Sequence, residues 1–128
     1  MAKFDEAFEK VVFNEGGYVN DPDDRGGETY MGISRRAHPN SIIWKHVDKI
    51  TSKYKTAKTI TKYLKQNKEL TSEIKALYKS DYWARFNLDK EKSQRLANQI
   101  FDNAVNRGID ATKKLIQRIK NEMAVIKK

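Results

Sequence analysis

The stretch that decides the fold lies near the amino terminus and reads Phe13-Asn14-Glu15-Gly16-Gly17-Tyr18-Val19-Asn20-Asp21-Pro22-Asp23-Asp24-Arg25-Gly26-Gly27-Glu28-Thr29-Tyr30-Met31-Gly32-Ile33. An amphipathic helix is predicted before it, because one helical face of residues 3–14 carries Phe4, Ala7, Phe8, Val11 and Val12. Glycine tolerates the left-handed conformation of a helix C-cap, so Gly16 and Gly17 predict that this helix ends beside Glu15. In residues 18–33, Gly, Asp and Pro are interspersed with Tyr, Val and Thr, which predicts short strands and turns.

From about residue 34 onward the sequence predicts helices. The apolar residues with helical spacing are Ile60, Tyr63 and Leu64, then Ile74, Leu77 and Tyr78, then Leu96, Ala97, Ile100, Phe101, Ala104 and Val105, and finally Ala111, Leu115, Ile116, Ile119 and Met123. Thr71-Ser72-Glu73 predicts the start of one helix, and Gly108 predicts the end of another. We therefore expect a mainly α (α+β) fold, with a small β-hairpin after the first helix.

Two carboxylates flanking this junction indicate cleavage of a glycosidic bond. In such enzymes one carboxylic acid, with a raised pKa, protonates the leaving oxygen, while another stays ionised on the opposite face of the sugar. Glu15 would be the acid, since the carboxyl end of a helix disfavours a negative charge and so raises the pKa. Asp24 would stabilise the oxocarbenium-like charge or help to activate water, and Thr29 could hold that water. Asp21 and Asp23 are alternatives to Asp24, because the Asn-Asp-Pro-Asp run also forms turns.

The composition narrows the chemistry further. A chain of 128 residues suits one domain, and the lack of cysteine excludes disulfides and thiolate metal sites. The two histidines, His38 and His46, do not have the spacing of a zinc hydrolase. Residues 21–32 begin like a calcium loop, but Arg25 and Gly32 stand where oxygen ligands are needed. We expect no metal and no cofactor.

The net charge of +9 is unevenly distributed. Residues 1–33 hold eight acidic and three basic residues, so the remainder of the chain is strongly basic. A basic body with one acidic segment suits an enzyme that adheres to a polyanionic matrix, such as a bacterial cell wall, and keeps its acids in the cleft. Ordinary lysine-rich solubilisation is the alternative interpretation.

Aromatic residues accompany the acidic segment. Tyr18 and Tyr30 bracket the acidic loop, and Trp83 lies in a cluster with Tyr82 and Phe86 after a predicted helix. Carbohydrate sites often use such rings as apolar platforms, so we expect Tyr18, Tyr30 and Trp83 to bind substrate. A tryptophan at the end of a helix is also a common core residue, and that alternative stays open for Trp83.

Three blocks of the chain resemble glycoside hydrolase family 108, the phage and prophage lysozymes marked by Glu-Gly-Gly-Tyr. The first is Glu15-Gly16-Gly17-Tyr18 with Val19-Asn20-Asp21-Pro22, Gly26-Gly27-Glu28-Thr29 and Gly32-Ile33. The second is Tyr78-Lys79-Ser80-Asp81-Tyr82-Trp83, and the third is Ile100-Phe101-Asp102-Asn103-Ala104-Val105-Asn106-Arg107-Gly108. Eight and then four residues separate Glu15, Asp24 and Thr29, whereas the wider phage lysozymes have eight and five.

The resemblance implies a lysozyme-like helical domain over residues 1–128 that cleaves the muramic acid–glucosamine backbone of peptidoglycan, with Glu15 as the catalytic acid. Asn103, in the third block, is expected to contact the substrate. In family members, the helix after the third block usually opens a C-terminal peptidoglycan-binding module that continues with further helices. Residues 93–128 are a candidate remnant of this module. We expect the protein to be made in the cytoplasm without a signal peptide and to reach the wall by release or export, with a holin as the natural partner.

Two other functions are compatible with this sequence. A non-catalytic cell-wall-binding or secretion-accessory protein could use the same scaffold, and the short C-terminus favours it weakly. A nucleic-acid binder could use the net charge and the lysines of residues 45–68, but the chain shows no arginine-rich recognition helix and no DNA-binding motif. We therefore expect neither a specific nucleic-acid partner nor insertion into a membrane, and we leave the oligomeric state open.

Overall fold

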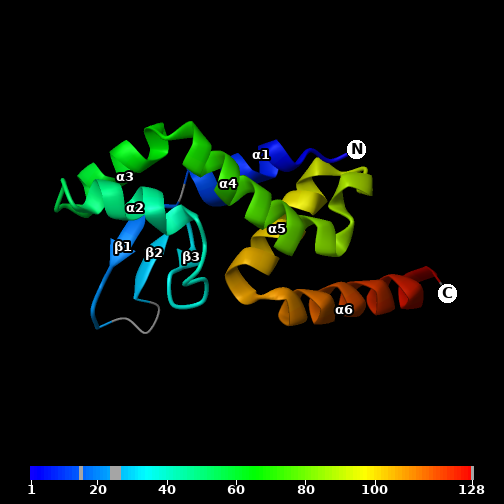
Figure 1. Ribbon diagram of the computed structural model, residues 1–128. Coiled ribbons are helices and arrows are strands. Elements are labelled where there is room, and N and C mark those ends of the chain that lie inside the picture. The colour runs from blue at the N-terminus through cyan, green and yellow to red at the C-terminus, as the bar shows by residue number, and fades with distance from the viewer. Residues whose placement is uncertain (15, 24–26, 128) are drawn as a thin grey trace.

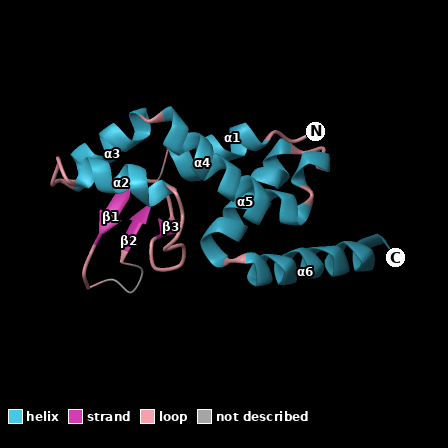
Figure 2. Ribbon diagram, in the orientation of Figure 1, coloured by secondary structure: helices cyan, strands magenta, loops and turns pink. Residues whose placement is uncertain are grey.

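The computed structural model describes residues 1–14, 16–23 and 27–127. These residues form six α-helices: α1 (Phe4–Phe8), α2 (Ile43–Thr51), α3 (Ala57–Gln66), α4 (Lys68–Tyr78), α5 (Gln94–Arg107) and α6 (Ile109–Lys127). They also form one antiparallel sheet in the order β1 (Tyr18–Asn20), β2 (Glu28–Tyr30) and β3 (Ile33–Ser34). The predicted fold class is confirmed, because a mainly helical chain carries one small sheet after its first helix (Figure 2).

The elements form two groups, and the helices from the middle of the chain contribute to both. In Figure 1 the sheet lies beneath α2 and α3, while α1, α4 and α5 meet beside it. The last helix, α6, runs away from the sheet along the far side of α5. Among the described residues, no helix combines the length and the apolar character needed to cross a membrane.

The first helix changes its geometry before it reaches the Glu-Gly-Gly-Tyr motif. α1 continues into a π-helical turn, η1 (Glu9–Phe13), which adds one residue to the turn. Phe4, Phe8 and Val12 are buried as predicted, whereas Val11 is displaced to a half-buried position. The period of 3.6 residues does not predict this turn. Single π turns occur frequently next to functional sites.

An aromatic cluster joins elements that are far apart in the sequence. Phe4 of α1, Trp83 of the π turn η2 (Lys79–Trp83) and Phe101 of α5 lie with their ring centroids 5.5–5.8 Å apart. The rings meet at 71–79°, the edge-to-face arrangement that aromatic quadrupoles prefer. The N-terminal helix is therefore fixed against the two helical blocks that follow the sheet.

The turn between β2 and β3 is held by a residue from α4. Met31 and Gly32 both have positive φ angles, of 50° and 79°, and they connect the paired residues Tyr30 and Ile33. This is the type I′ geometry that suits a two-residue hairpin, but a methionine in it is strained by about 1–3 kcal/mol. The buried Tyr78 hydroxyl donates a hydrogen bond of 2.5 Å to the Met31 carbonyl oxygen. A Cβ atom on residue 32 would lie 2.7 Å from the same hydroxyl, which explains the glycine there.

Polar side chains start the longer helices. Thr56, Asn67 and Ser93 accept hydrogen bonds from the backbone N–H groups of Thr59, Leu70 and Leu96, the arrangement of an N-cap. The predicted helix start at Thr71-Ser72-Glu73 is therefore wrong, because these residues lie inside α4. Leu70 is fully buried, so α4 has to begin before it.

The α5–α6 junction follows the prediction at Gly108. This glycine has a φ of 94° and ends α5, and α6 begins at the next residue. Asn103 Nδ2 donates to Thr112 Oγ1 at 2.8 Å, and the Thr112 hydroxyl donates to the Gly108 carbonyl oxygen at 2.8 Å. These two bonds join the end of α5 to the first turns of α6.

Tyr78→Phe should lower the free energy of unfolding by about 1–3 kcal/mol, because the buried Met31 carbonyl would lose its hydrogen bond. Urea denaturation followed by circular dichroism measures this change. Tyr82→Phe is the matched control, since it removes a hydroxyl from the neighbouring, less buried ring and should change stability by less than about 0.5 kcal/mol. Equal effects of the two substitutions would contradict the role assigned to Tyr78.

Candidate active site

The chain around the Glu-Gly-Gly-Tyr motif is tightly packed on the β2–β3 turn. Glu15 lies outside the described residues, but both of its neighbours are described. The Gly16 N–H donates to the Val12 carbonyl oxygen at 2.7 Å and so closes the end of the π turn. A Cβ atom on residue 16 would lie 2.6 Å from that oxygen and 2.8 Å from Met31 Cα. Neither Gly16 nor Gly17 has a positive φ. The expected left-handed helix cap at these glycines is therefore wrong. Gly16 is needed because the β2–β3 turn lies so close to its Cα atom.

Two further hydrogen bonds hold the residues that follow. The Gly17 carbonyl oxygen accepts from the Met31 N–H at 3.4 Å, and the Tyr18 N–H donates to Thr61 Oγ1 of α3 at 2.9 Å. Residues 16–18 are thus attached on one side to the turn and on the other to a helix. This attachment fixes the backbone of residues 16–18, the described part of the Glu-Gly-Gly-Tyr motif.

Thr29 sits in the middle strand of the sheet. It pairs with Val19 of β1 and Ser34 of β3, and its side chain is half-buried. Because side chains alternate along a strand, Thr29 shares its face with the exposed Val19 and not with the buried Tyr18 and Tyr30. The structure therefore places Thr29 on the side of β2 that faces away from the core.

The three aspartates of the acidic loop differ in what the structure shows. Asp21 Oδ1 accepts from the Asp23 N–H at 2.9 Å, which is an Asx turn, so Asp21 shapes the loop. Asp23 is exposed. Asp24 lies outside the described residues.

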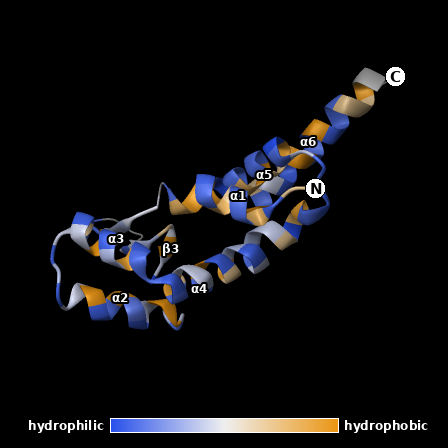
Figure 3. Cartoon of the chain, turned by 90° about the horizontal axis from the view of Figure 1, so that it is seen from above, coloured by the Kyte–Doolittle hydropathy of each residue, from blue (hydrophilic) through white to orange (hydrophobic). Residues whose placement is uncertain are grey.

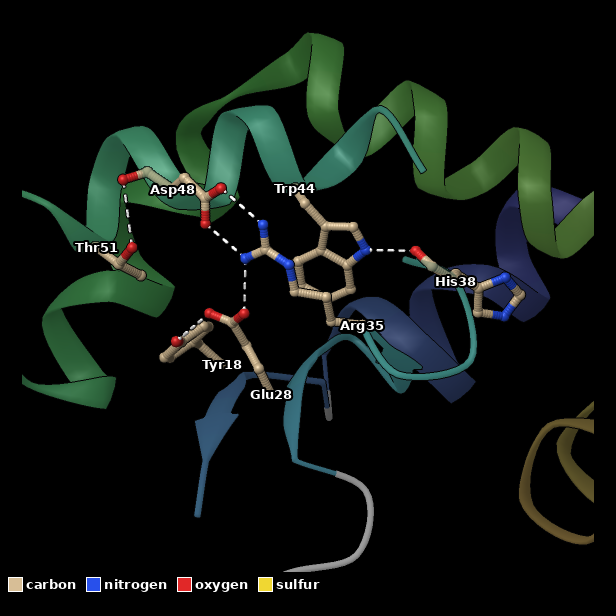
Figure 4. A network of polar contacts seen from close by, with 7 residues as sticks. All are labelled: Tyr18, Glu28, Arg35, His38, Trp44, Asp48 and Thr51. Atoms are coloured by element: carbon tan, nitrogen blue, oxygen red, sulfur yellow. Dashed lines mark hydrogen bonds and ion pairs between the residues drawn. The ribbon is translucent and has the colours of Figure 1, made fainter. Parts of the chain in front are cut away.

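A network missed by the sequence analysis covers the other face of the sheet (Figure 4). Tyr18 donates to Glu28 Oε2 at 2.5 Å, and Arg35 donates to Glu28 Oε1 at 2.9 Å. The same guanidinium reaches Asp48 of α2 with two bonds, of 2.6 and 2.8 Å. Arg35 therefore ties the middle strand to a helix. Its pairs lie 7 and 13 residues apart, so they cannot be found before the hairpin register is known.

The electrostatics of this network follow from its charges. Burial, together with the hydrogen bond to Glu28 and its negative charge, raises the pKa of Tyr18 to about 12. Tyr18 is therefore a neutral hydrogen-bond donor at ordinary pH. The hydrogen bonds from Arg35 lower the pKa of Asp48. The Arg35 guanidinium also lies 5.3 Å from the Trp44 ring centroid, and Trp44 Nε1 donates to the His38 carbonyl oxygen at 2.7 Å.

The order of these elements along the chain fits one known family. The sequence model described as glycosyl hydrolase 108 matches residues 8–108. The matched residues run from the end of α1 through the sheet, α4 and α5 to the glycine that ends α5. The chain belongs to glycosyl hydrolase family 108.

Membership in family 108 confirms the resemblance drawn from the three sequence blocks, and it makes this protein a glycoside hydrolase. The matched residues include Glu15, Asp24 and Thr29, as well as Trp83 and Asn103. α6 lies beyond them. A search of curated proteins finds no match to the chain.

Of the aromatic residues expected to bind substrate, Tyr30 and Trp83 have no accessible surface. Trp83 packs in the aromatic cluster and donates from Nε1 to Asp89 at 2.7 Å, so it has the core role that was the open alternative. Burial raises the pKa of Tyr30. Tyr18 is also buried, with its hydroxyl on Glu28. In this conformation the rings of Tyr30 and Trp83 offer no face to a sugar, whereas Tyr18 lines a small pocket with Tyr54 and Ile60.

Asn103 lies apart from the sheet, half-buried between α5 and α6, with its amide on Thr112. The structure thus brings Thr29, Tyr18 and Tyr30 together in the sheet, and it places Trp83 and Asn103 in two other parts of the molecule.

One group of side chains in the family 108 enzyme has the composition of a metal site. His46 of α2 lies beside Glu69 and Glu73 of α4, with their potential ligand atoms within 4.8 Å of one another. The Asn67 carbonyl oxygen Oδ1 accepts from the Leu70 N–H, so its Nδ2 group must donate to His46 Nδ1, 3.2 Å away. His46 then carries its proton on Nε2, which faces Glu73 at 3.4 Å. In this arrangement the three side chains form a polar contact between α2 and α4.

Arg35→Met should lower the free energy of unfolding by about 1–3 kcal/mol, mainly because Glu28 would lose its cation. The Glu28 side chain is 16% exposed and that of Asp48 is 53% exposed. Adding Glu28→Gln to Arg35→Met should therefore restore part of the lost stability, whereas adding Asp48→Asn should restore little. Urea denaturation of the single and double variants tests this. Equal rescue by both would show that Glu28 is not the buried partner.

Proposed function

We propose that this glycoside hydrolase is an N-acetylmuramidase, which cleaves the glycan backbone of bacterial peptidoglycan by general acid catalysis through Glu15. The observation that carries the proposal is the family 108 match together with the position of Glu15 in its Glu-Gly-Gly-Tyr block. General acid catalysis needs a carboxyl group that is held within hydrogen-bond reach of the leaving oxygen. The packing of Gly16 on Met31 and the attachment of residues 16–18 support that requirement.

The proposed reaction uses three groups from the matched segment. Glu15 donates its proton to the glycosidic oxygen while the bond from that oxygen to the anomeric carbon breaks. The Asp24 carboxylate stabilises the positive charge that develops on the sugar and accepts a proton from the attacking water. Thr29 holds this water, and its place on the outward side of β2 supports the assignment. Glu15 ends as a carboxylate and regains a proton from solvent, while Asp24, protonated by the attacking water, releases its proton to solvent.

The charge of the surface supports a polyanionic substrate. α2 and α3 carry the exposed lysines Lys45, Lys49, Lys58 and Lys62, and the whole chain has a net charge of +9. Cationic surfaces raise the local concentration of an anionic polymer and speed the encounter with it. We propose that the enzyme reaches the wall after release or export, for which a holin would be the partner.

A second candidate function is non-catalytic wall binding on the same scaffold. The burial of Tyr30 and Trp83 removes two of the rings that would have lined a sugar site, and this observation favours it. Such a protein would pellet with purified wall without releasing reducing sugar. The following experiments separate it from the muramidase.

Glu15→Gln should reduce the release of reducing ends from purified peptidoglycan by at least about 100-fold, because amide nitrogen cannot supply the proton. The thermal melt and the pelleting with wall should stay as in the wild type. Glu9→Gln is the matched control, an exposed glutamate on η1 that should leave the rate unchanged. Undiminished release by Glu15→Gln would remove Glu15 from the mechanism, and no release by the wild type would favour the binding protein.

Asp24→Asn should reduce the same rate by a smaller factor, of about 10-fold or more, because it removes the negative charge that faces the developing cation. Asp23→Asn is the matched control on the neighbouring residue and should leave the rate close to that of the wild type. A loss of activity in Asp23→Asn but not in Asp24→Asn would transfer the second carboxylate role to Asp23.

A further inference from the structure

An apolar groove of about 500 Å³ lies between α5 and α6, away from the sheet and from the Glu-Gly-Gly-Tyr motif. Its apolar lining comes from both helices: Leu96, Ile100, Leu115, Ile116, Ile119 and Met123. Leu115, Ile119 and Met123 recur every four residues, so they form one continuous ridge along α6. Figure 3 shows apolar residues along α6, which extends beyond the rest of the molecule.

The groove is not filled by the described part of the chain. Leu96, Ile119 and Met123 expose 39%, 42% and 52% of their surface. They are three of the seven large hydrophobic residues that are exposed among the described residues. An apolar surface concentrated in this way marks an interaction site.

The charges on the groove indicate the chemistry of its partner. Its lining carries two acidic residues, Glu91 and Asp102, and one basic residue, Lys120. This acidic rim is set in a chain of net charge +9. Acidic side chains repel an anionic wall polymer or an anionic membrane, and they attract a basic partner. The groove therefore suits an amphipathic helix with an apolar ridge and basic flanks.

We propose that this partner is α6 of a second copy of the chain. α6 has the required ridge, and outside the groove lining its flanks carry Lys113, Lys114 and Arg118 against the acidic Asp110 and Glu122. One chain thus holds both the groove and the helix that fits it. A two-fold arrangement fills both grooves at once and forms a four-helix core from the two α5–α6 pairs. The α6 side of this interface lies outside the residues matched by family 108, and its α5 side lies within them.

The test is sedimentation velocity of the full chain over about a 100-fold range of protein concentration, where a dimer should give way to monomer on dilution. Met123→Glu should weaken the association at least about tenfold, because it places a charge in the apolar core of the interface. Val125→Glu is the matched control, since Val125 is on the same helix, is 71% exposed and does not line the groove. It should leave the association unchanged.

Three results would overturn the proposal. A monomer at every concentration would exclude the dimer, and an equal loss in Met123→Glu and Val125→Glu would exclude this groove as its interface. The third is a monomer that pellets with vesicles of phosphatidylglycerol and phosphatidylethanolamine, and loses this binding in Met123→Glu, which would assign the ridge to a membrane surface. Circular dichroism of both variants shows that each is folded, and their release of reducing ends stays a separate measurement of the proposed function.

Discussion

The hydrogen bond from the Tyr78 hydroxyl to the Met31 carbonyl oxygen is the contact on which the arrangement of the Glu-Gly-Gly-Tyr segment depends. It fixes a turn with two positive φ angles, one of them on a methionine that would not adopt it in isolation. This turn provides the surface on which Gly16 packs, at a distance that no side chain would permit. Gly16, Met31 and Tyr78 all lie within residues 8–108, which the family 108 model matches.

The two faces of the middle strand of the sheet differ in their contacts. Toward α2, Glu28 is bound by Tyr18 and Arg35, and Arg35 continues to Asp48. On the opposite face Val19, which pairs with Thr29, is exposed. The charged network therefore fixes one face of this three-residue strand to α2, while the face that carries Thr29 and Val19 is turned away from the core.

Much of the fold could be predicted from the sequence, because apolar spacing reports which side of a helix is buried. Phe4, Phe8 and Val12 are buried as expected, and Gly108 ends its helix. The spacing cannot report long-range packing. It did not predict the π turn η1. It also did not predict the close contact that requires Gly16 or the partners of Arg35, because these depend on residues that are distant in the sequence. Of the site, the sequence indicates the segment that carries it, while the register of the strands decides which residues face outward.

The distance in sequence between Met31 and Tyr78 has a consequence for how the protein is made. The two residues are 47 positions apart, so the hairpin turn lacks its stabilising partner until α4 has been synthesised and has docked. The aromatic cluster needs Phe101 as well. A nascent chain that has been synthesised only as far as the sheet therefore contains the motif residues but lacks the contacts that position them. Hydrolytic competence is expected to appear late in synthesis, when nearly the whole matched region is available to fold.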